Sequence, residues 1–168
     1  MAWLDLSPIL APLRWAVVGA AATRLYMPER YTRDLDVAIR FEDASAARKK
    51  LTAAKFTHAG ELSIGGSTWR APDGQTIDVI EGHETWWSNA LTEAQSNRDA
   101  QGLPILPLRY LALMKFQSGR VQDLADVTRM LGQADNKSLD AVRAIFRLYV
   151  PSDLSDLEQL ITLGKLEK

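Results

Sequence analysis

The distribution of apolar residues in the first half of the chain predicts several short β-strands. Residues 15–18, Trp-Ala-Val-Val, form a continuous apolar run that stops at Gly19, which is typical of a short buried strand. In residues 34–39 and 76–80 polar and apolar positions alternate, as they do in strands that bury one face. Glycines within residues 56–71 divide two more short strands. We therefore expect a sheet in this half of the chain.

Helical spacing of apolar residues predicts helices beside the sheet and throughout the second half. A short helix is expected over residues 5–14 and an amphipathic one over residues 43–54. Beyond Pro107 the expected helices cover residues 108–116, 121–131, 138–149 and 152–163, with breaks at Ser118-Gly119, at residues 132–137 and at Pro151. Ser138 and Ser152 are expected to be N-cap residues.

This order of elements predicts an α+β fold, in which a mixed sheet flanked by helices is followed by a C-terminal helical bundle. We expect residues 1–106 to form the core and residues 107–168 the helical region, both packed as one unit.

The composition is that of a soluble globular protein and excludes several kinds of chemistry. The 168 residues are 46% hydrophobic, with 20 basic and 21 acidic side chains and a formal net charge of −1, so the overall charge does not favour nucleic acid. The chain has no cysteine, which excludes disulfides, thiolate catalysis and cysteine-based zinc sites. The start of the chain does not resemble a signal peptide, and no apolar run reaches membrane-spanning length. We expect a cytoplasmic protein.

Three aspartates are expected on one face of the sheet. Side chains alternate along a strand, so Asp34 and Asp36 point one way while the apolar residues between and after them enter the core. Asp78 lies between two apolar residues of its own strand and also faces away from the core. If the two strands are neighbours, three carboxylates meet on one surface. Close carboxylates repel each other unless a cation lies between them, and their oxygens suit magnesium.

Gly19 lies where the first strand gives way to a helix, since Ala20 and the two alanines after it favour helix. The start of a helix presents free backbone N–H groups and the positive end of the dipole, which suit a phosphate. Considered one at a time, the turn is an ordinary strand-to-helix connection and the aspartates are ordinary solvent-facing residues. Their combination favours a site for nucleotidyl transfer, in which carboxylates hold magnesium and the third one accepts a proton.

The same residues resemble the signature of a known superfamily. Residues 18–20, Val-Gly-Ala, and residues 32–36, Thr-Arg-Asp-Leu-Asp, are similar to the helix-start glycine and Asp-x-Asp pair of polymerase-beta-like nucleotidyltransferases. The Thr-x-Asp-Leu-Asp form is particularly similar to the AbiEii-like branch, which includes toxins of type IV toxin–antitoxin systems. Enzymes of the family transfer a nucleotide from an NTP with magnesium.

The resemblance implies roles for individual residues. Asp34, Asp36 and Asp78 would be the catalytic carboxylates and the metal ligands, and the turn at Gly19 and Ala20 would contact the triphosphate. Arg33, which flanks the aspartate pair, is a further candidate for contacting phosphates.

The resemblance continues in the helical half of the chain. Residues 114–126 are similar to the branch's Met-Lys…Gly-Arg-x-Lys-Asp-x-x-Asp segment. This similarity implies that Lys115 contacts the nucleotide phosphates and that Asp123 is its partner acid. Without the resemblance, Lys115 near a helix end is expected to extend its ammonium group into solvent and to favour the helix dipole. Ala20, in place of a second glycine or serine, and Gln122, in place of a lysine, depart from the pattern.

The sequence therefore predicts a magnesium-dependent nucleotidyltransferase that moves an NMP from an NTP to an RNA end, a protein or a small molecule. The resemblance adds a toxin-like role and a cognate antitoxin as partner. The alternative, which the departures at Ala20 and Gln122 favour, is a weakly active or inactive protein of this fold that binds or regulates a partner. Trp86 and Trp87 either stack a base or belong to the core, and His58 and His83 are expected to be structural.

Overall fold

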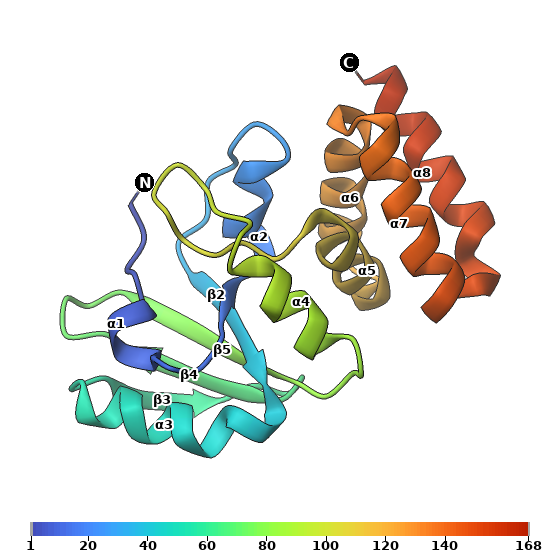
Figure 1. The fold of residues 1–168 in the computed structure, drawn as a ribbon. Coiled ribbons are helices and arrows are strands. Elements are labelled where there is room, and N and C mark those ends of the chain that lie inside the picture. The colour runs from blue at the N-terminus through green and yellow to red at the C-terminus, as the bar shows by residue number, and fades with distance from the viewer. Residues whose placement is uncertain (1, 168) are drawn as a thin grey trace. The chain divides into compact units, whose positions relative to one another are not determined.

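The computed structural model describes residues 2–167, and its fold combines a five-stranded sheet with helices (Figure 1). The chain forms two compact units. The sheet unit comprises the chain up to Ala22 together with Arg30–Leu106, and the helical unit comprises Thr23–Glu29 with the chain from Pro107 onward. The predicted α+β class is confirmed.

The sheet is mixed, and its strands are not in sequence order. They are β1 (Ala16–Val17), β2 (Leu35–Arg40), β3 (Thr57–Glu61), β4 (Gly66–Arg70) and β5 (Thr76–Gly82). Their spatial order is β1-β2-β5-β4-β3, with β2 parallel to β5 and every other pair antiparallel. A parallel pair needs a crossover connection, which here contains α3 (Ala44–Ala53) and the β3–β4 hairpin. The two aspartate-bearing strands are thus neighbours.

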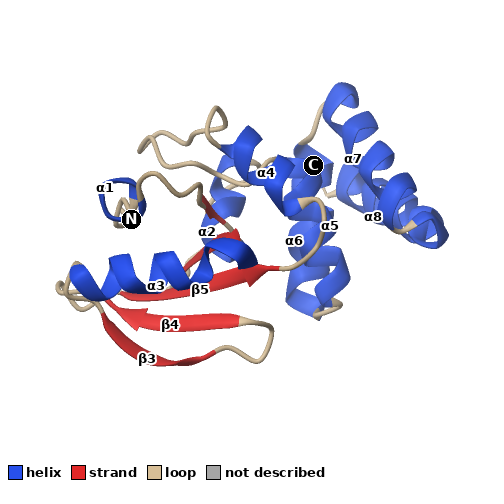
Figure 2. Cartoon of the chain, turned by 60° about the horizontal axis from the view of Figure 1, so that its bottom comes forward, coloured by secondary structure: helices blue, strands red, loops and turns tan. Residues whose placement is uncertain are grey.

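One face of the sheet carries the core of this unit. Its fully or almost fully buried positions on the two central strands are Leu35, Val37, Ile39, Ile77 and Val79. Figure 2 shows α3 running along one face of the sheet. Arg48 of α3 donates a hydrogen bond of 2.9 Å to Glu81, which follows Val79 on the same face of β5, so α3 covers the apolar face. Because side chains alternate, Asp36 and Asp78 lie on the opposite face.

The remaining elements of the sheet unit are short. The helices are α1 (Ser7–Leu10), α2 (Gly19–Ala22) and α4 (Trp87–Ala94), and a 3₁₀ turn covers Phe41–Asp43. The helix predicted over residues 5–14 is therefore shorter than expected. Pro12 explains its early end, because proline cannot donate a backbone hydrogen bond and disfavours helix at the residue before it.

The helical unit contains α5 (Leu108–Ser118), α6 (Val121–Gln133), α7 (Asn136–Tyr149) and α8 (Leu154–Leu166), with 3₁₀ turns at Thr23–Leu25 and Pro151–Asp153. The predicted breaks at Ser118-Gly119 and at Pro151 are confirmed, and Gly119 has the left-handed conformation common after a helix, with φ of 66°. α6 packs against α8 and α5 against α7. Within residues 2–167, no helix has both the length and the apolar composition needed to cross a bilayer.

Both N-cap predictions for this unit are wrong by a few residues. Asp135 caps α7, since its Oδ1 accepts the backbone N–H of Ser138 at 2.7 Å. Ser138 is therefore inside the helix, and the earlier acid provides the oxygen that the free N–H groups need. Ser152 lies within the 3₁₀ turn, and Asp153 occupies the cap position of α8.

Gly132 was expected to break a helix, but it lies inside α6, where the backbone of α8 approaches closely. A Cβ atom at Gly132 would lie 2.3 Å from the carbonyl oxygen of Gly164, and one at Gly164 would lie 2.1 Å from that of Thr128. These contacts involve backbone atoms, which cannot move aside without separating the helices. The two glycines therefore permit a close crossing of α6 and α8.

Replacing Gly164 with alanine is expected to destabilise the helical unit by about 1–3 kcal/mol, the usual cost of overpacking. The helical preference of alanine offsets part of this loss. The urea midpoint, followed by circular dichroism, measures the effect. Ser155→Ala on the exposed side of the same helix is the control and should leave the midpoint nearly unchanged. An equal midpoint for both variants would show that the helices do not cross this closely.

Candidate active site

Asp36 on β2 and Asp78 on β5 lie directly beside each other. They are Cα partners in the register of the parallel pair, and neighbouring strands lie about 4.8 Å apart. Partners in register share a face, so both carboxylates lie on the face opposite α3. Both side chains are half-buried. The strand pairing on which the prediction of a carboxylate cluster depended is therefore confirmed.

Gly19 lies against the carboxylate of Asp36. The glycine has a φ of 61°, and a Cβ atom at this position would lie 2.1 Å from Oδ2 of Asp36. The backbone N–H of Val18 donates to the carbonyl oxygen of Asp36 at 2.9 Å, which holds the end of β1 beside β2. A side chain at Gly19 would meet both the aspartate and an unfavourable backbone conformation. The predicted strand-to-helix turn thus adjoins one of the predicted carboxylates.

Asp78 has a hydrogen-bond donor on the adjacent strand, β4. The hydroxyl of Thr68 donates to Oδ1 of Asp78 at 2.6 Å, and the two residues are Cα partners in the antiparallel register. Sequence analysis did not identify Thr68. Counting outward from the turn at residues 71–75 would have paired residue 70 with 76 and residue 68 with 78, as the structure does.

The other predicted site residues of the sheet unit adjoin these two strands in the chain. Asp34 immediately precedes β2 and is exposed, and its carbonyl oxygen accepts a hydrogen bond of 3.4 Å from the hydroxyl of Thr32. Arg33 is exposed next to it, and Ala20 is half-buried in the first turn of α2. Their contacts with a nucleotide remain predictions.

Carboxylate oxygens on these strands are the kind of ligand that magnesium prefers. Over residues 2–167, no three acidic or histidine side chains form a ready-made metal cage. Magnesium is usually bound by one or two carboxylates and completes its octahedral coordination with water and substrate phosphates. Asp36 and Asp78, which pair in register, provide two hard oxygen ligands of this kind, and Asp34 lies just before β2.

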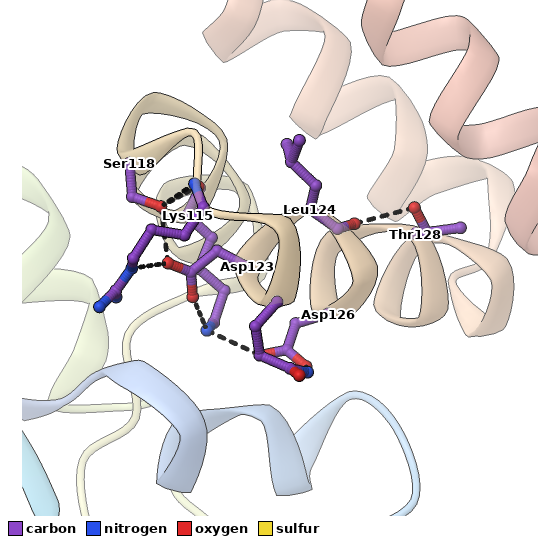
Figure 3. A network of polar contacts seen from close by, with 8 residues as sticks. Lys115, Ser118, Asp123, Leu124, Asp126 and Thr128 are labelled. Carbon is purple, nitrogen blue, oxygen red and sulfur yellow. Dashed lines mark hydrogen bonds and ion pairs between the residues drawn. The ribbon is translucent and has the colours of Figure 1, made fainter.

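Lys115 belongs to the helical unit and is the centre of a buried polar network (Figure 3). Its side chain is only 4% exposed, and its Nζ donates to Oδ1 of Asp123 at 2.8 Å and to Oδ2 of Asp126 at 2.9 Å. The two acids are three residues apart on α6 and so share one face of the helix. The expectation that the ammonium group extends into solvent is therefore wrong.

Asp123 receives further donors from the turn between α5 and α6. The hydroxyl of Ser118 and Nε of Arg120 each donate to its Oδ2 at 2.6 Å. Burial alone would raise the pKa of Asp123, but the hydrogen bonds from Lys115 and Ser118 outweigh it and hold this pKa below its ordinary value. Gln122, one of the two departures from the family pattern, donates to Oδ1 of Asp126 at 3.3 Å and so joins the network. Nucleotide contacts by Lys115 and Asp123 remain predictions.

The aromatic candidates of the sheet unit are explained by packing. Trp86 and Trp87 are 2% and 3% exposed and stack on each other with centroids 4.3 Å apart, so the core alternative is confirmed. Oε1 of Glu61 accepts a hydrogen bond of 2.9 Å from Nε2 of His58, and His83 stacks on Phe41. Both contacts agree with the structural role expected for the histidines.

Comparison with known proteins shows the fold of this chain. No protein-family model and no curated protein matches the sequence. The solution structure of the antibiotic-resistance factor ANT(2'')-Ia matches with a TM-score of 0.55 at 15% identity, over 88% of this chain and 86% of that chain. The crystal structure of the lincosamide antibiotic adenylyltransferase LnuA, bound to lincomycin, matches with a TM-score of 0.45 at 11% identity, over 77% of this chain and 87% of that chain. The chain therefore shares the fold of the antibiotic-resistance factor ANT(2'')-Ia over most of both chains.

Proposed function

We propose that the protein is a magnesium-dependent nucleotidyltransferase that moves an NMP from an NTP to a hydroxyl group of an acceptor. One observation carries this proposal. Asp36 and Asp78 are neighbours in register on parallel strands, and the backbone of Gly19 lies against the Asp36 carboxylate. The fold shared with ANT(2'')-Ia supports it. The ordinary explanation of solvent-facing aspartates does not account for a glycine that adjoins one of them.

The proposed reaction assigns different tasks to the carboxylates. Asp34 and Asp36 would hold a magnesium ion that also binds the phosphates of the NTP, and Asp78 would complete the site. Bound magnesium neutralises the phosphate charge and polarises the phosphoryl oxygens. As the acceptor oxygen forms its bond to the α-phosphorus, the bond from that phosphorus to the bridging oxygen breaks and pyrophosphate leaves. The proton of the acceptor hydroxyl passes to the carboxylate of Asp78.

The structural neighbour ANT(2'')-Ia is an antibiotic-resistance factor. We therefore extend the proposal to a small hydroxyl-bearing compound as the first acceptor class to test, ahead of RNA ends and proteins. The AbiEii-like resemblance adds a toxin-like enzyme with an antitoxin partner as a separate possibility for the biological role. Growth of bacteria that express the wild-type chain, compared with the Asp34→Asn/Asp36→Asn variant, distinguishes that role, because a toxin slows growth only while its site is intact.

Calorimetric titration with each of the four common NTPs, with and without magnesium chloride, tests the proposed site. We expect magnesium-dependent binding of at least one NTP to the wild-type protein and its loss in the Asp34→Asn/Asp36→Asn variant. Both substitutions remove charge at nearly constant shape, so the fold should be retained. Absence of binding at millimolar NTP would contradict the proposal and would favour the alternative of an inactive, partner-binding protein. Pyrophosphate release with small hydroxyl compounds, RNA or a protein extract then identifies the acceptor class.

A further inference from the structure

We propose that Thr68 is a positioning residue that fixes the carboxylate of Asp78 for nucleotidyl transfer. The proposal rests on the function proposed above and deepens it, because it explains how the proton-accepting group is held. Thr68 does not contact the reacting atoms and acts through the carboxylate of Asp78.

The hydrogen bond between these residues is short and joins two well-defined strands. Its O···O distance is 2.6 Å, within the range of hydroxyl groups that donate to ionised carboxylates. The strands are joined by a tight turn, in which Gly74 has a φ of 89° and Oδ1 of Asp73 accepts the backbone N–H of Gln75 at 2.9 Å. The turn fixes the register that places Thr68 opposite Asp78.

The choice of threonine makes the donor rigid. A β-branched side chain has few χ1 rotamers available on a strand, so the hydroxyl is directed at the neighbouring strand before a substrate binds. The residues on either side, Ser67 and Trp69, face the other side of the sheet, where the indole N–H of Trp69 donates to the hydroxyl of Ser67 at 2.8 Å. Their hydrogen bond therefore does not compete for Asp78.

A donor on Oδ1 restricts rotation of the carboxylate and leaves Oδ2 to face the substrate. Without this donor the carboxylate of Asp78 can rotate, so a smaller fraction of molecules holds the oxygen where an acceptor proton must be received. We expect the rate of the chemical step to fall more than the affinity for nucleotide. The proposed site at Asp34 and Asp36 for magnesium and the phosphates is unchanged in this variant.

Three variants distinguish the effect of the Thr68 hydroxyl group from the effect of how this side chain packs. Thr68→Val removes the hydroxyl and keeps the β-branched shape, whereas Thr68→Ser keeps the hydroxyl and loses a methyl group. Thr57→Val, at an exposed position of β3, is the matched control for a threonine-to-valine change in the same sheet. Each variant is assayed as the full chain with the NTP that binds the wild-type protein most tightly.

In Thr68→Val we expect kcat for pyrophosphate release to fall about tenfold to a hundredfold, the effect of one hydrogen bond to a charged group. The dissociation constant of the magnesium–NTP complex should stay within about twofold of the wild-type value. Thr68→Ser should recover most of kcat, and Thr57→Val should leave it unchanged. In the protein without nucleotide or metal, the ¹³C resonance of the Asp78 carboxyl should shift in Thr68→Val and stay close to wild type in Thr68→Ser.

Several outcomes would overturn the proposal, and they are distinct from a failure of the proposed function. An unchanged kcat or an unchanged Asp78 resonance in Thr68→Val would overturn it while the wild-type protein still binds and turns over NTP. An equal loss of kcat in Thr68→Ser and Thr68→Val would attribute the effect to packing and would also overturn it. Absence of magnesium-dependent NTP binding in the wild-type protein would overturn the proposed function, and the role of Thr68 with it.

Discussion

Replacing Asp36 with asparagine is expected to lower nucleotidyl transfer by about a thousandfold or more while the protein stays folded. A metal ion contributes several kcal/mol to the stabilisation of a phosphoryl-transfer transition state, and each 1.4 kcal/mol corresponds to about a factor of ten. Asparagine has nearly the same shape as aspartate but lacks the charge that the proposed magnesium site requires. Pyrophosphate release at saturating NTP and magnesium measures the loss.

Two controls accompany this prediction: the stability of Asp36→Asn and the activity of a variant at a different aspartate. Because asparagine keeps nearly the same shape as aspartate, Asp36→Asn should stay folded, and the urea midpoint checks this. Asp156→Asn, at an exposed position of α8, changes the net charge equally and should retain full activity. If Asp36→Asn kept more than about a tenth of wild-type activity, the metal assignment would be wrong.

The second large effect concerns stability, in the variant Lys115→Met. Methionine fills a similar volume but leaves the buried carboxylates of Asp123 and Asp126 without the cation that they share. Removing one partner of a buried ion pair typically costs about 3–5 kcal/mol. We therefore expect a large decrease in the urea midpoint, measured by circular dichroism at neutral pH. Arg129→Met, at an exposed position of α6, removes the same charge and should change the midpoint little.

The pH dependence of the stability loss in Lys115→Met tests whether the missing lysine charge causes it. In the wild-type protein the folded-state pKa of Asp123 is lowered, so its contribution to stability is present above the pKa of the unfolded state and is lost as pH falls through the folded-state value. In Lys115→Met, protonation instead relieves the carboxylates that have lost the lysine. The stability difference between the two proteins should therefore shrink on acidification, and a difference that is constant down to pH 3 would argue against loss of the lysine charge as the cause.

The parts of the fold that depend on local pattern could be predicted from the sequence. Alternation in residues 34–39 and 76–80 placed Asp36 and Asp78 on one face, and the pairing of β2 with β5 made them neighbours. Gly19 could be predicted as a strand-to-helix turn, since this depends on adjacent residues. Its close approach to Asp36 could not, because that contact depends on the packing of β1 against β2.

The errors and omissions share a cause, which is that contacts distant in sequence decide the role of a residue. Gly132 has a poor helical propensity, yet it lies within α6 because the backbone of α8 passes beside it at Gly164. The alternative for Lys115, an ammonium group that extends into solvent, is wrong because two acids on the next helix hold that group inside. Thr68 has no local feature that marks it, and its importance follows from the partner that the hairpin register places opposite it.

The division of the chain into units has a consequence for dissecting it with proteases. The chain passes from the sheet unit to the helical unit after Ala22, returns after Glu29 and leaves again after Leu106. Cleavage between Leu106 and Pro107 therefore does not release the sheet unit as an independent body. The resulting fragment retains Thr23–Glu29, including the buried Met27, without the helices to which that segment belongs. Because this segment joins Gly19 to the aspartate strand, a nick far along the sequence should disturb the connection between them.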